Sequence, residues 1–401
     1  MNLLKDDTIN ISLPSSDLIF TQYIYIKDEV RIALLLSILN KSNSAIFWAY
    51  ELYYSGFKHE LFSLIWKIYY DFFATLNPSY EAYLLKTHKQ FISSLEPDHC
   101  IVSSIIQDLL FRPLNTDIFM LRNICENFEI DIVFHNTTEK ITDTETAICN
   151  FKQWIINNDF RSIAQWILNM NKCISAIDIY AICLDIFCQE GIIPVNHKGK
   201  MKKDFITVTK FNNNINIILL AKIMQMFSKK VGLKKGRSVY INVEPNDISQ
   251  FSPMIGSNKC RPYRILEASC IHEINESKLL SLFKLTRNKY NIQEKYWYNW
   301  EYHAAFSPIW SKRIHQYGGY PDYTKQRIIF KEVPDDVLMQ QFYSLYGLEP
   351  DEQKKETQNK SIQIIEKVYD WKWFQLEYKK NGIFEVYDEE LDEFDVDGLK
   401  Y

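Results

Sequence analysis

The stretch SNSAIFWAYELYYSGFKHELFSLIWKIYYDFF, residues 42–73, decides the fold class of this chain. The apolar positions of its first half share one helical face: Ala45, Trp48, Ala49 and Leu52. Those of its second half form one stripe at helical spacing: Phe57, Leu61, Leu64, Ile65, Ile68 and Phe72. Gly56 lies between the two patterns and is a typical C-terminal stop for the first helix. So short a connection predicts an antiparallel helix pair.

Further helical patterns follow this pair along the chain. Several begin at a capping residue or a proline, and they cover residues 77–93, 97–112, 115–128, 146–157, 160–171 and 174–189. Helices that recur roughly every 20 residues give a hairpin period near 40 residues, which is typical of HEAT-like arrays. We therefore predict a helical-hairpin array over residues 28–191, preceded by an N-terminal arm at residues 1–27.

The composition changes after the array. We expect residues 192–272 to form a basic mixed segment with a small sheet, because Ser238–Val243 and Tyr263–Leu266 favour strands and turn-forming residues separate them. Residues 273–378 are expected to form an aromatic-rich helical part, and residues 379–401 an acidic tail. The predicted fold class is mainly α: a HEAT-like helical-hairpin array, then a mixed segment with a small β-hairpin and a second helical part.

Composition and charge exclude several classes of protein. The 401 residues are 47% hydrophobic, which excludes global disorder, and the net charge of −4 gives no overall attraction to nucleic acid. The longest aliphatic runs, Ile32–Leu36 and Ile217–Ala221, are far too short to span a membrane. The first residues lack the layout of a signal peptide. None of the eight cysteines forms a CxxC pair, so we expect reduced, buried thiols inside a cell.

Motifs for catalysis and for cofactors are absent from the sequence. There is no GxSxG and no HExxH, and Gly232–Arg237 has the wrong spacing for a phosphate-binding loop. Cys183, Cys188 and His197 are too loosely spaced for a zinc site and have no fourth ligand nearby. We therefore expect no catalytic residues, no cofactor and no metal.

A basic stretch is the first candidate binding feature. Lys198–Arg237 holds eleven Lys or Arg residues and a single acid, Asp204. The candidate nucleic-acid-binding residues are Lys202, Lys203, Lys229, Lys230, Lys234, Lys235 and Arg237. Phosphate backbones are the commonest large polyanions that such a stretch meets, so RNA is the expected partner. Two alternatives are a solvated, flexible loop and a docking site for the acidic tail of the same chain.

Aromatic residues supply the remaining candidates. Trp297, Trp300 and Trp310 lie near basic residues, which is typical of partner-binding surfaces, but the first two also fit a core stripe at helical spacing. The acidic tail interleaves its charges with apolar residues, among them Tyr387, Leu391 and Phe394. Such a tail is either a linear motif that folds on a partner or a solubilising end.

Two stretches resemble a known group of proteins. One is Phe47–Phe57 together with Asp71–Phe73 and Leu76–Pro78, and the other is Trp300–Phe306. Both are similar to a family of uncharacterised proteins of mimivirus-like giant DNA viruses, and the resemblance covers about a third of the chain. It implies a viral origin, and hence the host cytoplasm or viral factory, and it brings no known catalytic residues.

The array as a whole also resembles, in size and layout, the HEAT-type middle domain of translation-initiation factor 4G. That resemblance implies a scaffold that binds a helicase, a cap-binding protein and RNA. The motif for the cap-binding protein is incomplete here, because Glu349 follows Tyr343…Leu348 and Lys86 follows Tyr80…Leu85. The prediction is a non-enzymatic scaffold or adaptor in viral gene expression. The alternatives are a replication accessory protein that resembles a clamp-loader collar, without an ATPase domain, and a virion structural protein.

Overall fold

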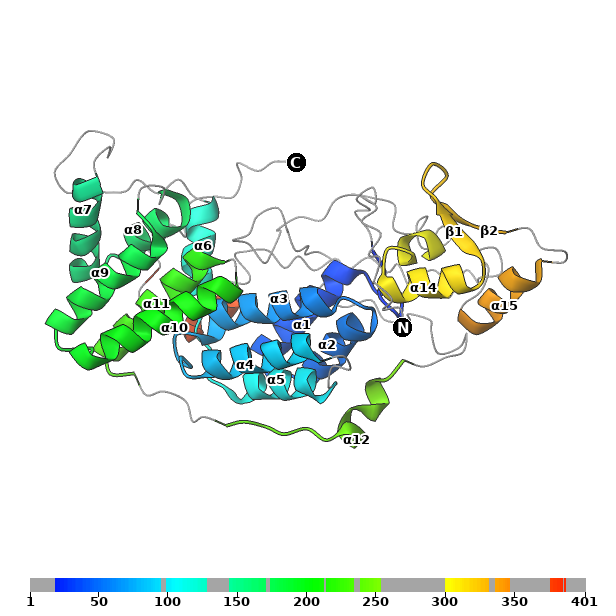
Figure 1. The fold of residues 1–401 in the computed structure, drawn as a ribbon, viewed down its shortest axis with the longest axis horizontal. Coiled ribbons are helices and arrows are strands. Elements are labelled where there is room, and N and C mark those ends of the chain that lie inside the picture. The colour runs from blue at the N-terminus through cyan, green and yellow to red at the C-terminus, as the bar shows by residue number, and fades with distance from the viewer. Residues whose placement is uncertain are drawn as a thin grey trace, which may run out of the picture.

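The computed structural model describes residues 19–94, 99–127, 144–170, 174–212, 214–233, 239–253, 300–331, 336–346, 376–384 and 386. Within these ranges the protein is mainly helical, and it has one two-stranded antiparallel sheet followed by a further helix. Figure 1 shows an elongated molecule with α1–α5 in the middle, α6–α11 at one end, and the sheet with α14 and α15 at the other. The predicted fold class is confirmed.

The helical hairpin predicted for residues 42–73 forms as expected. After α1 (Lys27–Leu39), α2 (Ser44–Tyr54) and α3 (Lys58–Ile68) are joined by Gly56, whose φ of 97° is in the left-handed region. A Cβ at Gly56 would also lie 2.5 Å from the side chain of Pro308, so this position needs glycine for two reasons. α3 continues as a π-helical turn, η1 (Tyr69–Phe73).

The next helices complete the middle of the molecule. α4 (Tyr80–Ser93) is followed by α5 (Cys100–Phe111), and carbonyl groups at the C-terminal end of α5 accept hydrogen bonds from a lysine side chain. The ammonium of Lys41 donates to the carbonyl oxygens of Leu109, at 2.9 Å, and Arg112, at 2.6 Å. Burial lowers the pKa of Lys41 to about 8. A cation at this position complements the negative end of the helix dipole.

The second half of the array also follows the predicted pattern. It contains α6 (Asp117–Asn127), α7 (Thr144–Asn157), α8 (Phe160–Gln165) with its π-helical extension η2 (Trp166–Met170), and α9 (Ala176–Gln189). Two of these helices begin at side-chain caps. The carboxylate of Asp159 accepts from the amide of Ser162 at 3.1 Å, and the hydroxyl of Ser175 accepts from the amide of Asp178 at 3.2 Å.

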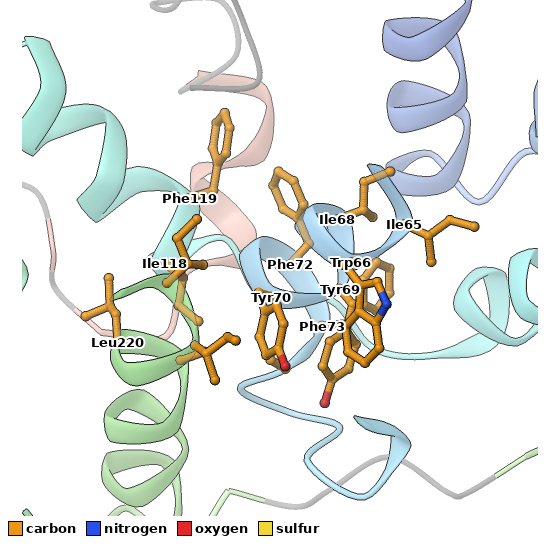
Figure 2. Close-up of a cluster of buried hydrophobic side chains, with 14 of the residues drawn as sticks. Ile65, Trp66, Ile68, Tyr69, Tyr70, Phe72, Phe73, Ile118, Phe119 and Leu220 are labelled. Atoms are coloured by element: carbon orange, nitrogen blue, oxygen red, sulfur yellow. The ribbon is translucent and has the colours of Figure 1, made fainter. Parts of the chain in front are cut away.

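α11 (Ile215–Lys230) is the central helix of this end of the molecule. Its residues from 217 to 228 are all buried, because α9, α10, η1 and η2 surround it. Figure 2 shows side chains of η1, α6 and α11 converging in one cluster, in which the Phe72 and Phe119 rings lie 4.9 Å apart. This cluster belongs to the larger of two hydrophobic cores.

The first half of the basic stretch is a helix and not a flexible loop. A short 3₁₀ turn, η3 (Val195–His197), leads into α10 (Lys198–Phe211), which the sequence analysis did not predict. The apolar face of α10 is narrow: Phe205 and Val208 are buried, while the lysines around them lie at the surface. So sparse an apolar pattern is easily taken for a loop.

The small sheet lies elsewhere than predicted. Residues 239–243 form no strand, because two side chains at the end of α5 hydrogen bond to their backbone groups. The guanidinium of Arg112, just after the helix, donates to the carbonyl oxygen of Val239 at 2.7 Å, and Asp108 accepts from the amide of Ile241 at 2.8 Å. The short helices α12 (Pro245–Ile248) and η4 (Ser249–Phe251) follow. The second predicted strand, residues 263–266, lies outside the described residues.

The observed sheet pairs β1 (Gly319–Asp322) with β2 (Arg327–Phe330), inside the part expected to be helical. The carboxylate of Asp322 accepts from the amides of Thr324 and Lys325, both at 3.0 Å, which closes the turn between the strands. Helices α14 (Pro308–Gln316) and α15 (Val337–Tyr346) flank the pair in sequence.

Residues of the N-terminal arm complete a second core. Its buried members are Phe20, Ile24, Ile26, Trp300, Ala304, Trp310, Ile314, Phe342 and Tyr346. The indole of Trp310 donates to the carbonyl oxygen of Thr21 at 2.9 Å, and the amide of Phe20 donates to that of His303 at 3.3 Å. The arm therefore connects the array to the second helical part.

Candidate anion-binding groove

The orientation of α10 decides which lysines face solvent. Phe205 is fully buried, and its ring stacks on that of Tyr180 in α9 with centroids 4.5 Å apart. Fixing this face inward turns the opposite face outward, where Lys203 and Lys210 are exposed and Lys202 is half-buried. Positions 203, 206, 207 and 210 recur every three or four residues, so they share one side of the helix.

This outward face forms one wall of an open groove, and α4 contributes to the other. The groove has a volume of about 670 Å³, and its lining residues are Lys89, Gly199, Lys202, Lys203, Ile206, Thr207, Lys210 and Phe211. Four of the eight are lysines and none is acidic. The ammonium of Lys89 lies 5.6 Å from the centre of the Phe211 ring, which brings a cation and an aromatic face together at the edge of the groove.

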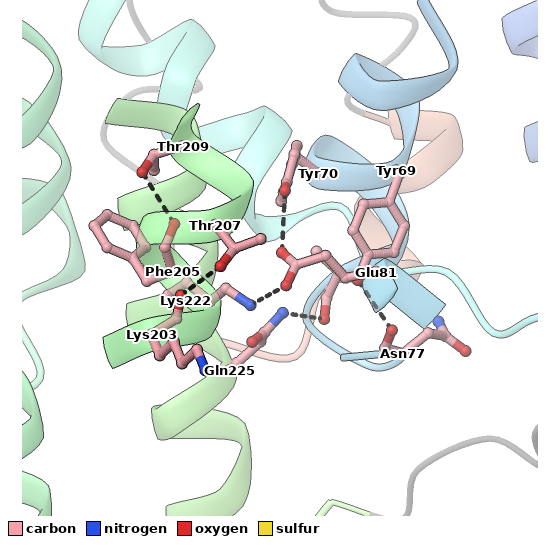
Figure 3. Close-up of polar contacts among 11 residues, drawn as sticks. Tyr69, Tyr70, Asn77, Glu81, Lys203, Phe205, Thr207, Thr209, Lys222 and Gln225 are labelled. Carbon is pink, nitrogen blue, oxygen red and sulfur yellow. Dashed lines mark hydrogen bonds and ion pairs between the residues drawn. The ribbon is translucent and has the colours of Figure 1, made fainter. Parts of the chain in front are cut away.

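Other polar groups of this region are already engaged. The hydroxyl of Thr207 donates to the carbonyl oxygen of Lys203 at 2.8 Å, within α10 (Figure 3). Lys198 pairs with Asp185, and Lys230 pairs with Glu190 at 3.1 Å. Among the residues that the structure describes, no acidic side chain forms an ion pair with any of the four lysines of the groove. Within the described residues, the groove therefore presents four lysines that form no ion pair with an acidic side chain.

A buried polar network holds the two walls in place. Lys222 of α11 pairs with Glu81 of α4, and the hydroxyl of Tyr70 donates to Glu81 at 3.0 Å (Figure 3). Gln225 donates to the carbonyl oxygen of Ala74 at 2.9 Å. Burial, and then the charge of Glu81, raise the pKa of Tyr70 well above its ordinary value. These contacts fix α4 against α11, and α11 in turn packs on α10.

The structure separates the predicted basic residues into three groups. Lys202 and Lys203 line the groove. Lys229 and Lys230 lie at the C-terminal end of α11, where Lys230 is engaged with Glu190. The last group lies outside the described residues: Lys234, Lys235 and Arg237.

Sequence reasoning named two of the eight lining residues, and three of the six that it missed carry a charge or an aromatic ring: Lys89, Lys210 and Phe211. Lys210 and Phe211 lie inside the basic stretch, and helical spacing from Lys203 would have found them had α10 been recognised. Lys89 lies more than a hundred residues earlier, on α4, and no local pattern links it to α10. Only the packing of α4 and α10 brings it to the groove.

The predicted aromatic partner surface is not at the surface. Trp300 is 2% exposed, as the core alternative expected, and Trp310, which that alternative did not include, is fully buried; both belong to the second core. Their rings pack edge to face with centroids 5.4 Å apart, and Arg313 lies over the ring of Trp310. The other aromatic and tail candidates lie outside the described residues: Trp297, Tyr387, Leu391 and Phe394.

Metal-binding residues do not gather in the described ranges, where no group of three or more His, Cys, Asp or Glu side chains could hold an ion. Cys183 is fully buried, and burial raises the pKa of its thiol, which makes it an inert core residue.

In the described ranges no helix combines the length and the apolar character needed to cross a bilayer. Comparisons of the chain with protein-family models, with curated proteins and with solved structures find no match.

Proposed function

We propose that this protein is a non-enzymatic helical scaffold that binds single-stranded RNA in the groove between α4 and α10. One observation carries the proposal: Lys89, Lys202, Lys203 and Lys210 converge from two helices on a groove whose lining has no acidic residue. The rest of the chain more than balances this charge, since the overall net charge is −4. A local concentration of cations in an acidic protein is what selective attraction of a polyanion requires.

The chemistry of the lining favours a single strand over a duplex. Lysine ammonium groups are mobile point charges that neutralise phosphates without reading sequence. Phe211 adds an aromatic ring at the end of the lysine row, and unpaired bases stack on such rings. A duplex keeps its bases paired and could use only the lysines.

We extend the proposal to a translation scaffold of the initiation-factor-4G kind that acts in the host cytoplasm or viral factory. The support is the helical-hairpin organisation of α2–α9 beside a basic groove. Affinity purification from infected cells tests this extension. Recovery of a helicase and a cap-binding protein supports it, whereas recovery of polymerase or clamp subunits supports the replication alternative.

Charge reversal with a matched control tests the RNA proposal. In fluorescence anisotropy with a labelled single-stranded RNA, Lys202→Glu with Lys203→Glu should weaken binding at least about tenfold, because two phosphate contacts become repulsive. Lys229→Glu with Lys230→Glu changes the net charge by the same amount away from the groove, and should weaken binding less than about threefold. Equal losses in both variants, or no RNA binding by the wild-type protein, would contradict the proposal.

A further inference from the structure

The C-terminal residues that the structure describes lie against the array far from their neighbours in sequence. Residues 376–384 and 386, which include the 3₁₀ turn η8 (Lys379–Asn381), contact the start of α6, the start of α8 and the end of α11. More than 260 residues separate them from their hydrogen-bond partners in α6. We call residues 378–386 the C-terminal clasp.

Backbone groups of the clasp carry most of its polar contacts. The carboxylate of Asp117 accepts from the amide of Ile383, at 3.2 and 3.1 Å, and from that of Phe384, at 3.3 Å. The amide of Thr116 donates to the carbonyl oxygen of Asn381 at 3.4 Å, and its hydroxyl donates to that of Tyr378 at 3.3 Å. Such contacts hold a peptide without regard to its side chains.

Side-chain anchors supply the selectivity that the backbone contacts lack. The Phe384 ring packs against Phe160, with centroids 4.9 Å apart, and lies 6.4 Å from Phe227. Val386 is 1% exposed, and its carbonyl oxygen accepts from the guanidinium of Arg161 at 2.8 Å. The two anchors are alternate residues of the chain, as in extended peptides that bind through every second side chain.

Glycine at position 382 completes the pattern. A Cβ there would lie 3.0 Å from the carboxylate of Asp117 and 3.2 Å from the carbonyl oxygen of Lys379. A larger side chain there requires the Asp117 carboxylate or the clasp to shift by a few tenths of an ångström, which weakens the hydrogen bonds to the next two amides. In this chain the sequence of the segment Gly382–Val386 has the form Gly-apolar-aromatic-x-apolar, and Phe384 and Val386 are its anchors.

From these contacts we infer that the surface formed by Thr116, Asp117, Phe160, Arg161 and Phe227 is a peptide-binding site. The clasp occupies it in cis, and a partner protein that carries the same Gly-apolar-aromatic-x-apolar segment competes for it. The clasp is suited to exchange, because its residues 379–384 contain one 3₁₀ turn and no other regular element, and Leu376, just before it, is 71% exposed. The inference does not depend on RNA binding, since the site and the groove have no residue in common.

The test uses the full chain and a labelled synthetic peptide of residues 376–387 as the probe. Gly382→Val weakens the chain's own clasp but leaves the receiving residues unchanged. In fluorescence anisotropy this variant should bind the peptide at least about tenfold more tightly than the wild-type chain does, because the intact clasp competes. Lys380→Ala, at a solvent-exposed clasp position, should behave as wild type.

Specificity and folding controls make the outcome decisive. A peptide with valine in place of Gly382 should not bind, and Asp117→Ala added to Gly382→Val should abolish binding of the native peptide. Failure of the native peptide to bind a Gly382→Val chain that remains folded by circular dichroism would overturn the inference, as would equal binding of both peptides.

If the Gly382→Val chain does not fold, hydrogen exchange on the wild-type chain tests the inference instead. Amides of Ile383 and Phe384 that exchange as slowly as those of α11 would make the clasp an integral part of the fold, whereas exchange at least about tenfold faster supports a ligand that leaves.

Discussion

α10 and α11 come from the same basic stretch, yet Lys222 of α11 and the groove lysines of α10 occupy opposite environments. Lys222 of α11 is 8% exposed and is paired with the buried carboxylate of Glu81. Lys203 and Lys210 of α10 face an open groove whose lining contains no acid. The difference arises from apolar content, since α11 is apolar on nearly all sides and α10 on only one. A count of charged residues along the sequence therefore does not distinguish lysines that stabilise the fold from lysines that face solvent and can bind a ligand.

The largest effect expected from this comparison is the loss of the buried lysine. Lys222→Met leaves the Glu81 carboxylate buried without its cation, and should lower the free energy of unfolding by about 3–5 kcal/mol. The matched change on α10, Lys203→Met, should alter it by less than about 0.5 kcal/mol. Urea unfolding followed by circular dichroism measures both. Similar losses for the two variants would show that the two lysines are not in different environments.

A second buried glutamate sharpens the comparison, because Glu51 is held by neutral donors where Glu81 has a lysine. Gln22 donates to Glu51 at 3.1 Å through its side chain, and the amide of Tyr23 donates at 3.0 Å. Burial, only partly opposed by these hydrogen bonds, raises the pKa of Glu51 from 4.5 to about 7. The folded protein therefore binds more protons than the unfolded chain between these two values. Its stability should fall as the pH rises through this window and level off above about 7.

Glu51→Gln should remove this part of the pH dependence. The wild-type protein should lose up to about 3 kcal/mol more than the variant between pH 4.5 and pH 8, since one pKa unit corresponds to about 1.4 kcal/mol. Urea unfolding at both pH values measures the difference. Burial also raises the pKa of Asp108 and Asp117 to about 6. Both residues are present in the wild-type protein and in the variant, so their contributions to the pH dependence of stability cancel in the comparison. Parallel pH profiles for the two proteins would contradict the assignment to Glu51.

The same contrast explains which elements the sequence could predict. The α2–α3 hairpin was predictable because apolar residues at helical spacing flank Gly56, and local pattern and tertiary packing agree there. α10 was not predictable, because its apolar pattern is sparse: two buried side chains, Phe205 and Val208, are sufficient to pack it against the array. The strand expected at 238–243 failed because Asp108 and Arg112, distant in sequence, bind its backbone.

The candidate site was predictable only in part, for a similar reason. Charge composition identified Lys202 and Lys203, which are local to the basic stretch. Lys89 reaches the groove from α4, and the predicted Lys230 is instead engaged in an ion pair with Glu190. The positions of both lysines depend on tertiary contacts, which the sequence pattern does not show. Burial of Trp300 and Trp310 depends likewise on the N-terminal arm, whose Phe20 and Ile26 pack in the same core. Patterns along the chain locate elements, whereas packing decides which of their faces remain free.

The salt dependence of RNA affinity tests the central claim most directly. A plot of log affinity against log salt concentration for single-stranded RNA should have a slope of about −3 for the wild-type protein, since four lysines each neutralise one phosphate. Lys202→Glu with Lys203→Glu should reduce the magnitude of the slope by about 1.4. Lys229→Glu with Lys230→Glu should leave it within about 0.5 of the wild-type value. A slope that is unchanged by the groove variant would contradict the assignment of RNA binding to the groove between α4 and α10.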